Sequence, residues 1–237
     1  MQCAAGVRAR ENMTERTDEA LRKLSDESCY VRWRAAKELR RSTDKEAIFP
    51  LVKALRDDEC LVRWVAAEAL ATHGDEAIPP LLQLLKEQDH EVRWRAAWAL
   101  GRIGGEQALR ALTHALKDQD PDVRWRAAWA LGETKTSEAV EPLIGALKDA
   151  SLDVRLAALE SLGNIQNRRA VVPLVQIFAD EKRGVVERIE AAEALGKIGD
   201  EAALLPLEEA ILRDEPAALH EAARRALSLV KKEETSG

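Results

Sequence analysis

The segment VRWRAAWAL occurs twice, at residues 92–100 and 123–131, and sets the pattern of the whole chain. Related copies are VRWRAAKEL (31–39), VRWVAAEAL (62–70) and VRLAALESL (154–162), so they recur at steps of 31, 30, 31 and 31 residues. ERIEAAEAL (187–195) is a sixth copy, and LHEAARRAL (219–227) is a divergent seventh. Self-similarity at such a period is the signature of a repeat architecture.

A second segment recurs between these copies. Its members are AIFPLVKAL (47–55), AIPPLLQLL (77–85), ALRALTHAL (108–116), AVEPLIGAL (139–147), AVVPLVQIF (170–178) and ALLPLEEAI (203–211). Five prolines share one register near its start, where a missing N–H costs a helix little: Pro50, Pro80, Pro142, Pro173 and Pro206. Each repeat is therefore predicted to be a pair of amphipathic helices. Four glycines that follow the second helix's leucine are expected to end that helix with positive φ: Gly101, Gly132, Gly163 and Gly196.

Composition supports an all-helical chain and narrows the possible functions. Aromatic residues make up 4% of the 237 residues, whereas the strong helix formers Ala, Leu, Glu, Arg and Lys are abundant. No apolar run is long enough to span a membrane, and the N-terminus has no apolar stretch typical of a secretory signal. The net charge of −6, with both signs interspersed, argues against a general phosphate-binding surface. Three cysteines, an odd number, suit a reducing environment, so we expect a cytoplasmic protein.

The pattern resembles the HEAT-like repeats of phycobilisome-lyase-type proteins. Their motif is Val-Arg-x-x-Ala-Ala-x-Ala-Leu-Gly, then Ile-Gly-Asp, then Ala-Val-x-Pro-Leu, and the nearest copies here are 92–104, 123–132 and 139–147. The resemblance covers about residues 14–228. It implies an α-solenoid, a right-handed superhelix of about seven helix pairs. The expected domain is 14–230, with a disordered N-terminal tail at 1–13 and a polar C-terminal tail at 231–237.

An arginine and an acid recur together in five repeats. The arginines are Arg32, Arg63, Arg93, Arg124 and Arg155, and six residues before them stand Asp26, Asp57, Glu87, Asp118 and Asp149. One interpretation is an anion-binding row. The favoured interpretation is structural: each acid accepts hydrogen bonds at the inter-helix turn and pairs with the arginine of its own or the next repeat.

The six tryptophans are predicted to share one face of the second helices. On a helical wheel of about 100° per residue, Val92, Ala96, Ala99, Leu100 and Ile103 form the core stripe, and Trp94 and Trp98 lie opposite it. In the solenoid that the resemblance implies, second helices line the inner, concave wall. The candidate partner-binding residues are Trp33, Arg34, Trp64, Trp94, Arg95, Trp98, Trp125, Arg126 and Trp129.

This wall favours a non-catalytic scaffold that binds another protein, since tryptophan and arginine are enriched at interface hot spots. The alternative, that the indoles only stack between repeats as a stabilising ladder, is compatible with binding. The N-terminal half is expected to hold an acidic segment with apolar anchors, because it presents Arg34, Lys37, Arg95 and Arg126 against Glu68. The later repeats replace the Trp register with Leu156 and Ile189 and carry Glu160, Glu190 and Glu193.

Other functions receive less support from the sequence. HEAT-like phycobilin lyase subunits bind an open-chain tetrapyrrole, and a Trp/Arg wall would suit that pigment. Deoxyhypusine hydroxylase, a HEAT-like di-iron enzyme, needs several His-Glu pairs, but only His90-Glu91 and His220-Glu221 occur. Nucleic-acid binding is disfavoured by the acidic fifth and sixth repeats. We therefore expect no cofactor and no metal, and we expect Cys3, Cys29 and Cys60 to be free thiols.

Overall fold

The computed structural model describes residues 15–42, 44–213 and 215–234, and every regular element in these ranges is helical. The predicted tail at 1–13 and the end of the predicted C-terminal tail at 235–237 lie outside the described residues. The chain divides into two compact units, residues 1–108 and 109–237.

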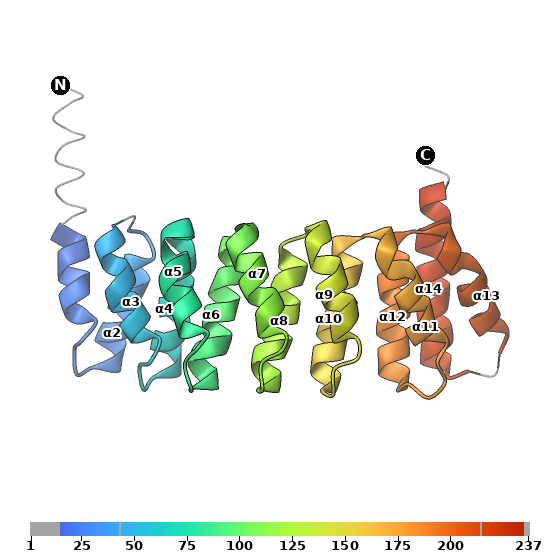
Figure 1. Cartoon of the computed structure of the whole chain (residues 1–237), viewed down its shortest axis with the longest axis horizontal. Coiled ribbons are helices and arrows are strands. Elements are labelled where there is room, and N and C mark those ends of the chain that lie inside the picture. Colours follow the sequence, from blue (N-terminus) through green and yellow to red (C-terminus); the bar gives the residue numbers. More distant parts are fainter. Residues whose placement is uncertain (1–14, 43, 214, 235–237) are drawn as a thin grey trace, which may run out of the picture. The chain divides into compact units, whose positions relative to one another are not determined.

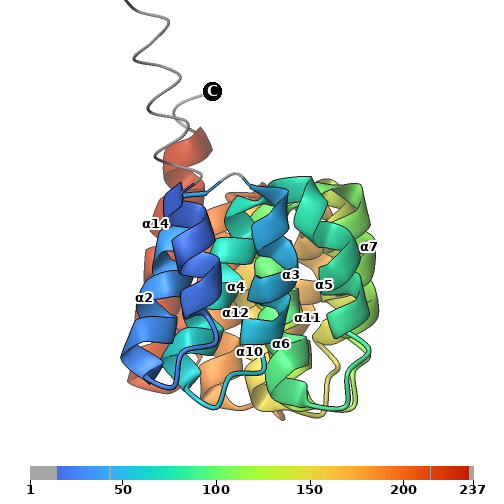
Figure 2. The same ribbon diagram turned by 90° about the vertical axis from the view of Figure 1, so that its left-hand side faces the viewer.

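The first unit is a stack of helix pairs. Residues 15–23 are helical, and α2 (Cys29–Leu39), α3 (Ile48–Ala54), α4 (Cys60–Thr72), α5 (Ile78–Leu84) and α6 (His90–Ile103) follow (Figure 1). The second helices pack on one another in the order α2, α4, α6, while α3 packs on α4 and α5 on α6. Figure 2 shows α3 and α5 to one side of α2 and α4. The predicted helix pairs are confirmed here.

The second unit repeats this arrangement. Its helices are α8 (Pro121–Glu133), α9 (Val140–Ala146), α10 (Leu152–Ile165), α11 (Val171–Ala179), α12 (Val185–Ile198), α13 (Leu204–Leu212) and α14 (Ala217–Glu234), and α7 (Gly105–Ala115) spans the division between the units. The second helices α8, α10, α12 and α14 pack in succession, and α9, α11 and α13 cover them (Figure 1). Because α14 continues to Glu234, it extends past the predicted domain end at 230.

The prolines lie where the sequence places them. Each is the third residue of its helix, in α3, α5, α9, α11 and α13, where first-turn N–H groups have no helical partner. A short 3₁₀ turn precedes each of these helices: η1 (Lys45–Ala47), η2 (Gly74–Ala77), η3 (Ser137–Ala139), η4 (Arg168–Ala170) and η5 (Glu201–Ala203). The prolines therefore mark the starts of the first helices.

The glycines after the second-helix leucine have a different role from the predicted one. Gly101, Gly132, Gly163 and Gly196 lie inside α6, α8, α10 and α12, and positive φ among glycines occurs instead at Gly74, Gly104, Gly105 and Gly199. A Cβ on Gly163 would lie 2.9 Å from Ala194 Cα, and one on Gly196 would lie 2.8 Å from Ala226 Cα. The prediction of helix ends at these positions was wrong, because glycine is needed for close approach of neighbouring second helices.

The alanine-rich stripe forms the core as predicted. In α6, Val92, Ala96, Ala99 and Leu100 are at most 1% exposed, while Ile103 at the helix end is half-buried. Small side chains let the axes of adjacent helices approach closely. The second helices therefore hold the surface residues in a repeating register.

The arginine–acid ladder is structural. Arg124 donates from Nε and from a terminal nitrogen to Asp149 at 2.7 and 3.0 Å, and Arg32 binds Asp57 in the same way at 2.6 and 2.9 Å. A further guanidinium nitrogen of each arginine donates to two carbonyls at the turn of its own repeat. Each acid also accepts from the backbone N–H two residues on. The predicted ladder is confirmed at these joints, although Glu87 instead pairs with Arg56.

The sixth repeat builds its joint from a different residue. Glu187 occupies the register of the core valine, yet it is 4% exposed and accepts hydrogen bonds from Arg155 at 2.7 and 3.0 Å. Arg183 donates to the same carboxylate at 2.8 Å. Arg188 in turn binds Glu215 through two bonds of 2.9 and 2.6 Å. The buried side chains of Glu187 and Arg188 are therefore both ion-paired. A buried charge without a partner would destabilise the folded state.

Candidate functional site: a tryptophan surface and an acidic hollow

Three indoles cluster on the second helices of the first unit. The ring of Trp64 on α4 lies 6.3 Å from that of Trp94 and 4.7 Å from that of Trp98, both on α6. Trp64 and Trp94 are half-buried, but Trp98 is only 8% exposed. The predicted common face therefore exists in this unit, with Trp98 beneath it as a support and Trp64 and Trp94 at its surface.

Arg95 does not lie on that surface as the sequence suggested. It is 4% exposed, and its guanidinium carbon lies 4.1 Å from the centre of the Trp94 ring. It also donates to both the carbonyl and the carboxylate of Glu91, at 2.7 and 2.5 Å. The bond from Arg95 holds the pKa of Glu91 below its ordinary value. The side chain of Arg95 folds back by one helical turn, so its charge is neutralised by Glu91 and its guanidinium packs against the Trp94 ring. Arg95 therefore supports Trp94 and offers no free charge to a partner.

At the other end of this unit the aromatic surface is more open and more basic. Trp33 on α2 is half-buried, and its ring lies 5.8 Å from that of Tyr30, which is 62% exposed. Lys37 Nζ lies 4.9 Å from the Trp33 ring, and Arg34 is exposed. Sequence reasoning overlooked Tyr30, although it precedes Trp33 by three residues and so shares its helix face.

The second unit carries two indoles on α8 with an arginine between them. The Arg126 guanidinium carbon lies 4.2 Å from the Trp125 ring and 5.5 Å from the Trp129 ring. All three side chains are half-buried. The arrangement matches the predicted Trp/Arg register, and stacking on both rings restricts the rotamers of the arginine.

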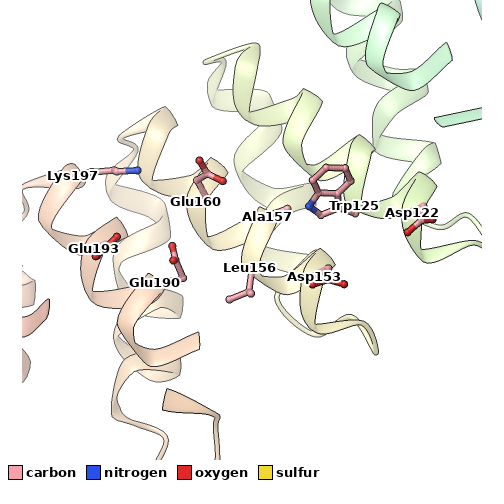
Figure 3. A pocket seen from close by; sticks show the side chains of 9 residues that line it. All are labelled: Asp122, Trp125, Asp153, Leu156, Ala157, Glu160, Glu190, Glu193 and Lys197. Carbon is pink, nitrogen blue, oxygen red and sulfur yellow. The ribbon is translucent and has the colours of Figure 1, made fainter. Parts of the chain in front are cut away.

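A hollow of about 620 Å³ lies on α8, α10 and α12 of the same unit. Trp125 stands at one end, Leu156 and Ala157 lie in the middle, and three glutamates with a lysine stand at the other end (Figure 3). The lining residues are Asp122, Trp125, Asp153, Leu156, Ala157, Glu160, Glu190, Glu193 and Lys197. Asp122 and Asp153 were not singled out from the sequence, although both stand three residues before the Trp register.

Like charges crowd the glutamate end. Burial, followed by repulsion from Glu193 and Glu160, raises the pKa of Glu190, and Lys197 only partly opposes this. Glu193 pairs with Arg225 at 3.0 Å. Within the described ranges, Asp122, Asp153, Glu160 and Glu190 form no ion pair. The hollow therefore holds an excess of negative charge.

Sequence comparisons place this architecture in a known family. The model of HEAT repeats matches residues 17–77, 49–120 and 109–189, and the model of the PBS lyase HEAT-like repeat matches residues 187–213. The chain belongs to the HEAT repeat family. A comparison of this HEAT repeat protein with curated proteins gave no match.

Solved structures share the fold of this HEAT repeat protein. An engineered protein is 23% identical, with 91% of this chain and 68% of that chain covered and a TM-score of 0.52. The complex of CpcE and CpcF of phycocyanin lyase from a Nostoc species is 22% identical, with coverage of 91% and 94% and a TM-score of 0.50. Human deoxyhypusine hydroxylase in complex with glycerol is 27% identical, with coverage of 91% and 84% and a TM-score of 0.49.

The histidines, the cysteines and the apolar helices of the described residues bear on other kinds of site. In the described part of the chain, no three His, Cys, Asp or Glu side chains stand close enough together to hold a metal ion. His73 and His220 bond to the backbone carbonyls of Ala69 and Arg213. Cys29 and Cys60 are free thiols, as predicted, and both are exposed; Cys3 lies outside the described residues. None of the helices in the described ranges combines the length and apolar character that a membrane crossing requires.

Proposed function

We propose that this HEAT repeat protein is a non-catalytic scaffold that binds a segment of another protein on its indole surface. The indole surface comprises the half-buried tryptophans Trp33, Trp64 and Trp94 of the first unit. A reducing, cytoplasmic setting suits the two exposed free thiols, Cys29 and Cys60. The proposal assigns recognition to the second helices and catalysis to none of the described residues.

The observation that carries this proposal is the support given to Trp64 and Trp94. Trp64 packs on the buried Trp98 at 4.7 Å, and Trp94 is covered on one side by Arg95 at 4.1 Å. Both indoles nevertheless keep part of their surface exposed to solvent. Rings held in place before binding lose little conformational entropy when a partner arrives, so their apolar area converts efficiently into affinity.

The proposed partner segment is acidic and carries apolar anchors. Arg34 and Lys37 provide exposed positive charge beside Trp33 in the first unit. Arg95 contributes no free charge, because Glu91 neutralises it. The charge that selects an acidic partner therefore comes from α2, and the indoles of α4 and α6 supply the apolar contact area.

A selection with displayed peptides tests the proposal. We expect random peptides selected on the protein to be rich in Asp and Glu around one or two large apolar residues. The double variant Trp64→Ala/Trp94→Ala should lose these peptides while its far-UV circular dichroism stays helical. Phe49→Ala is the matched control, because Phe49 is an aromatic residue that is 69% exposed but lies on α3, the first helix of its repeat, and not on a second helix. Equal binding by the double variant and the control would exclude the indole surface.

A second candidate is a phycobilin-lyase-like subunit that binds a tetrapyrrole and a protein. The match of residues 187–213 to the PBS lyase HEAT-like repeat favours it. Incubation of the protein with an open-chain tetrapyrrole, followed by gel filtration, tests this candidate. Co-elution of visible absorbance with the protein supports it, and complete separation of pigment from protein argues for the scaffold alone.

A further inference from the structure

We infer that the hollow on α8, α10 and α12 binds a Lys- or Arg-rich segment of a protein partner. This inference goes beyond the proposed function, which concerns the indole surface and an acidic segment. Three features of the second unit support it: the negative charge of the hollow, the electrostatic repulsion among its carboxylates and the apolar residues at its centre. The occupant is an extended basic peptide rather than an ion, because the carboxylates do not converge on one point.

The charge of the hollow is complementary to such a segment. Five carboxylates face one cation, Lys197, and Lys197 donates to Asn164 at 3.0 Å. In the structure as far as it is described, four of the five form no ion pair, and they are Asp122, Asp153, Glu160 and Glu190. Basic side chains of a partner would find free acceptors for charge-assisted hydrogen bonds.

The carboxylates at the glutamate end repel one another in the free protein. Glu160, Glu190 and Glu193 stand together on α10 and α12, with Glu190 half-buried between them (Figure 3). Burial and the charges of its two neighbours disfavour the ionised form of Glu190. A bound cation would relieve this repulsion, so part of the binding free energy comes from removal of a cost that the unbound protein carries.

The middle of the hollow suits the aliphatic part of lysine and arginine. Leu156 and Ala157 provide an apolar floor, and the half-buried Trp125 offers a ring at one end (Figure 3). Long basic side chains lay their methylene stems on apolar surface while their charged ends seek carboxylates, and they also stack on indoles. The volume of about 620 Å³ accommodates a few side chains of an extended segment.

Fluorescence anisotropy with a short labelled peptide of Lys and Leu in a two-to-one ratio tests the inference on the full chain. We expect saturable binding that weakens with salt. Glu160→Gln/Glu190→Gln should raise the dissociation constant about tenfold, because one half-buried and one exposed charge pair are lost. The matched control, Glu181→Gln/Glu201→Gln, removes the same charge at exposed positions outside the hollow and should bind like the wild type.

The outcomes separate this inference from the proposed function. Equal weakening in both glutamine variants would mean general charge attraction, and no weakening in either would mean that the hollow is not used; each result overturns the inference. Trp64→Ala/Trp94→Ala, in the first unit, should retain the Lys–Leu peptide and lose the acidic selected peptides. A variant that loses only the acidic peptides therefore reports on the indole surface, and a variant that loses only the Lys–Leu peptide reports on the hollow.

Discussion

The buried indole of Trp98 lies 4.7 Å from the half-exposed ring of Trp64, with an interplanar angle of 45°. Trp98 stands on α6 and Trp64 on α4, so this contact joins consecutive second helices. The tilted arrangement is one that aromatic pairs favour. The same contact therefore stabilises the repeat stack and positions a residue of the indole surface, which reconciles the stacking and binding interpretations of the tryptophans.

Trp98→Ala should destabilise the protein more than any change at the exposed indoles. Loss of a buried aromatic side chain costs about 3 kcal/mol or more, and a cavity would open beneath Trp64. Urea unfolding followed by circular dichroism measures the change. Trp33→Ala, at a half-buried position on α2, should shift the midpoint much less. Equal shifts for the two variants would contradict the supporting role of Trp98.

Gly163→Ala and Gly145→Ala should change stability in opposite directions. A Cβ on Gly163 would lie 2.9 Å from Ala194 Cα, so α10 and α12 must separate, at a cost of about 1–3 kcal/mol. Nothing lies within 4 Å of a Cβ on Gly145 in α9, where alanine should add about 0.5–1 kcal/mol. Thermal melts of the two variants measure both effects, and a stabilising Gly163→Ala would refute the close-approach explanation.

Acid should weaken the joint around Glu187. The hydrogen bond from Arg155, followed by that from Arg183, holds the pKa of Glu187 below its ordinary value of 4.5 despite burial. A depressed pKa in the folded state contributes stability above the unfolded pKa, and this contribution is lost as the pH falls through the folded value. Unfolding midpoints measured from about pH 7 down to about pH 3 should therefore fall at the acid end. Glu187→Gln should flatten that fall.

Glu187→Ala extends this test at neutral pH. Removing one partner of a buried ion pair leaves the arginine uncompensated, so we expect a loss of about 3 kcal/mol. The comparison variant is Glu138→Ala, an exposed position in η3 that should cost little. A small effect of Glu187→Ala would show that solvent replaces the lost carboxylate.

Glu190→Gln should stabilise the free protein slightly at neutral pH. Burial and the neighbouring glutamates raise the pKa of Glu190, so its ionised form destabilises the folded state above that pKa, and the penalty is relieved as the pH falls through it. The gain should stay below about 1 kcal/mol, because solvent screens a half-exposed cluster. Unfolding by urea at neutral and mildly acidic pH measures it, with Glu181→Gln as a control. A gain that persists unchanged in acid would contradict an electrostatic origin.

The repeat spacing and the proline register determined the helix pairs, because both depend on local backbone rules. The core positions of α6 and the turn-capping acids followed from periodicity in the same way. Helical wheels also placed the indoles on one side of their helices. These properties belong to single helices or to adjacent turns, which is why one sequence sufficed to predict them.

Tertiary packing decided the rest. Trp98 and Arg95 lie on the predicted face yet are buried, because a neighbouring helix and a carboxylate one turn away cover them. Gly163 serves contact between helices rather than a helix end. Burial and charge balance depend on which side chains from distant repeats meet, and a helical wheel carries no information about those neighbours. The acidic hollow of the second unit arises in the same way, from residues on three helices that only packing brings together.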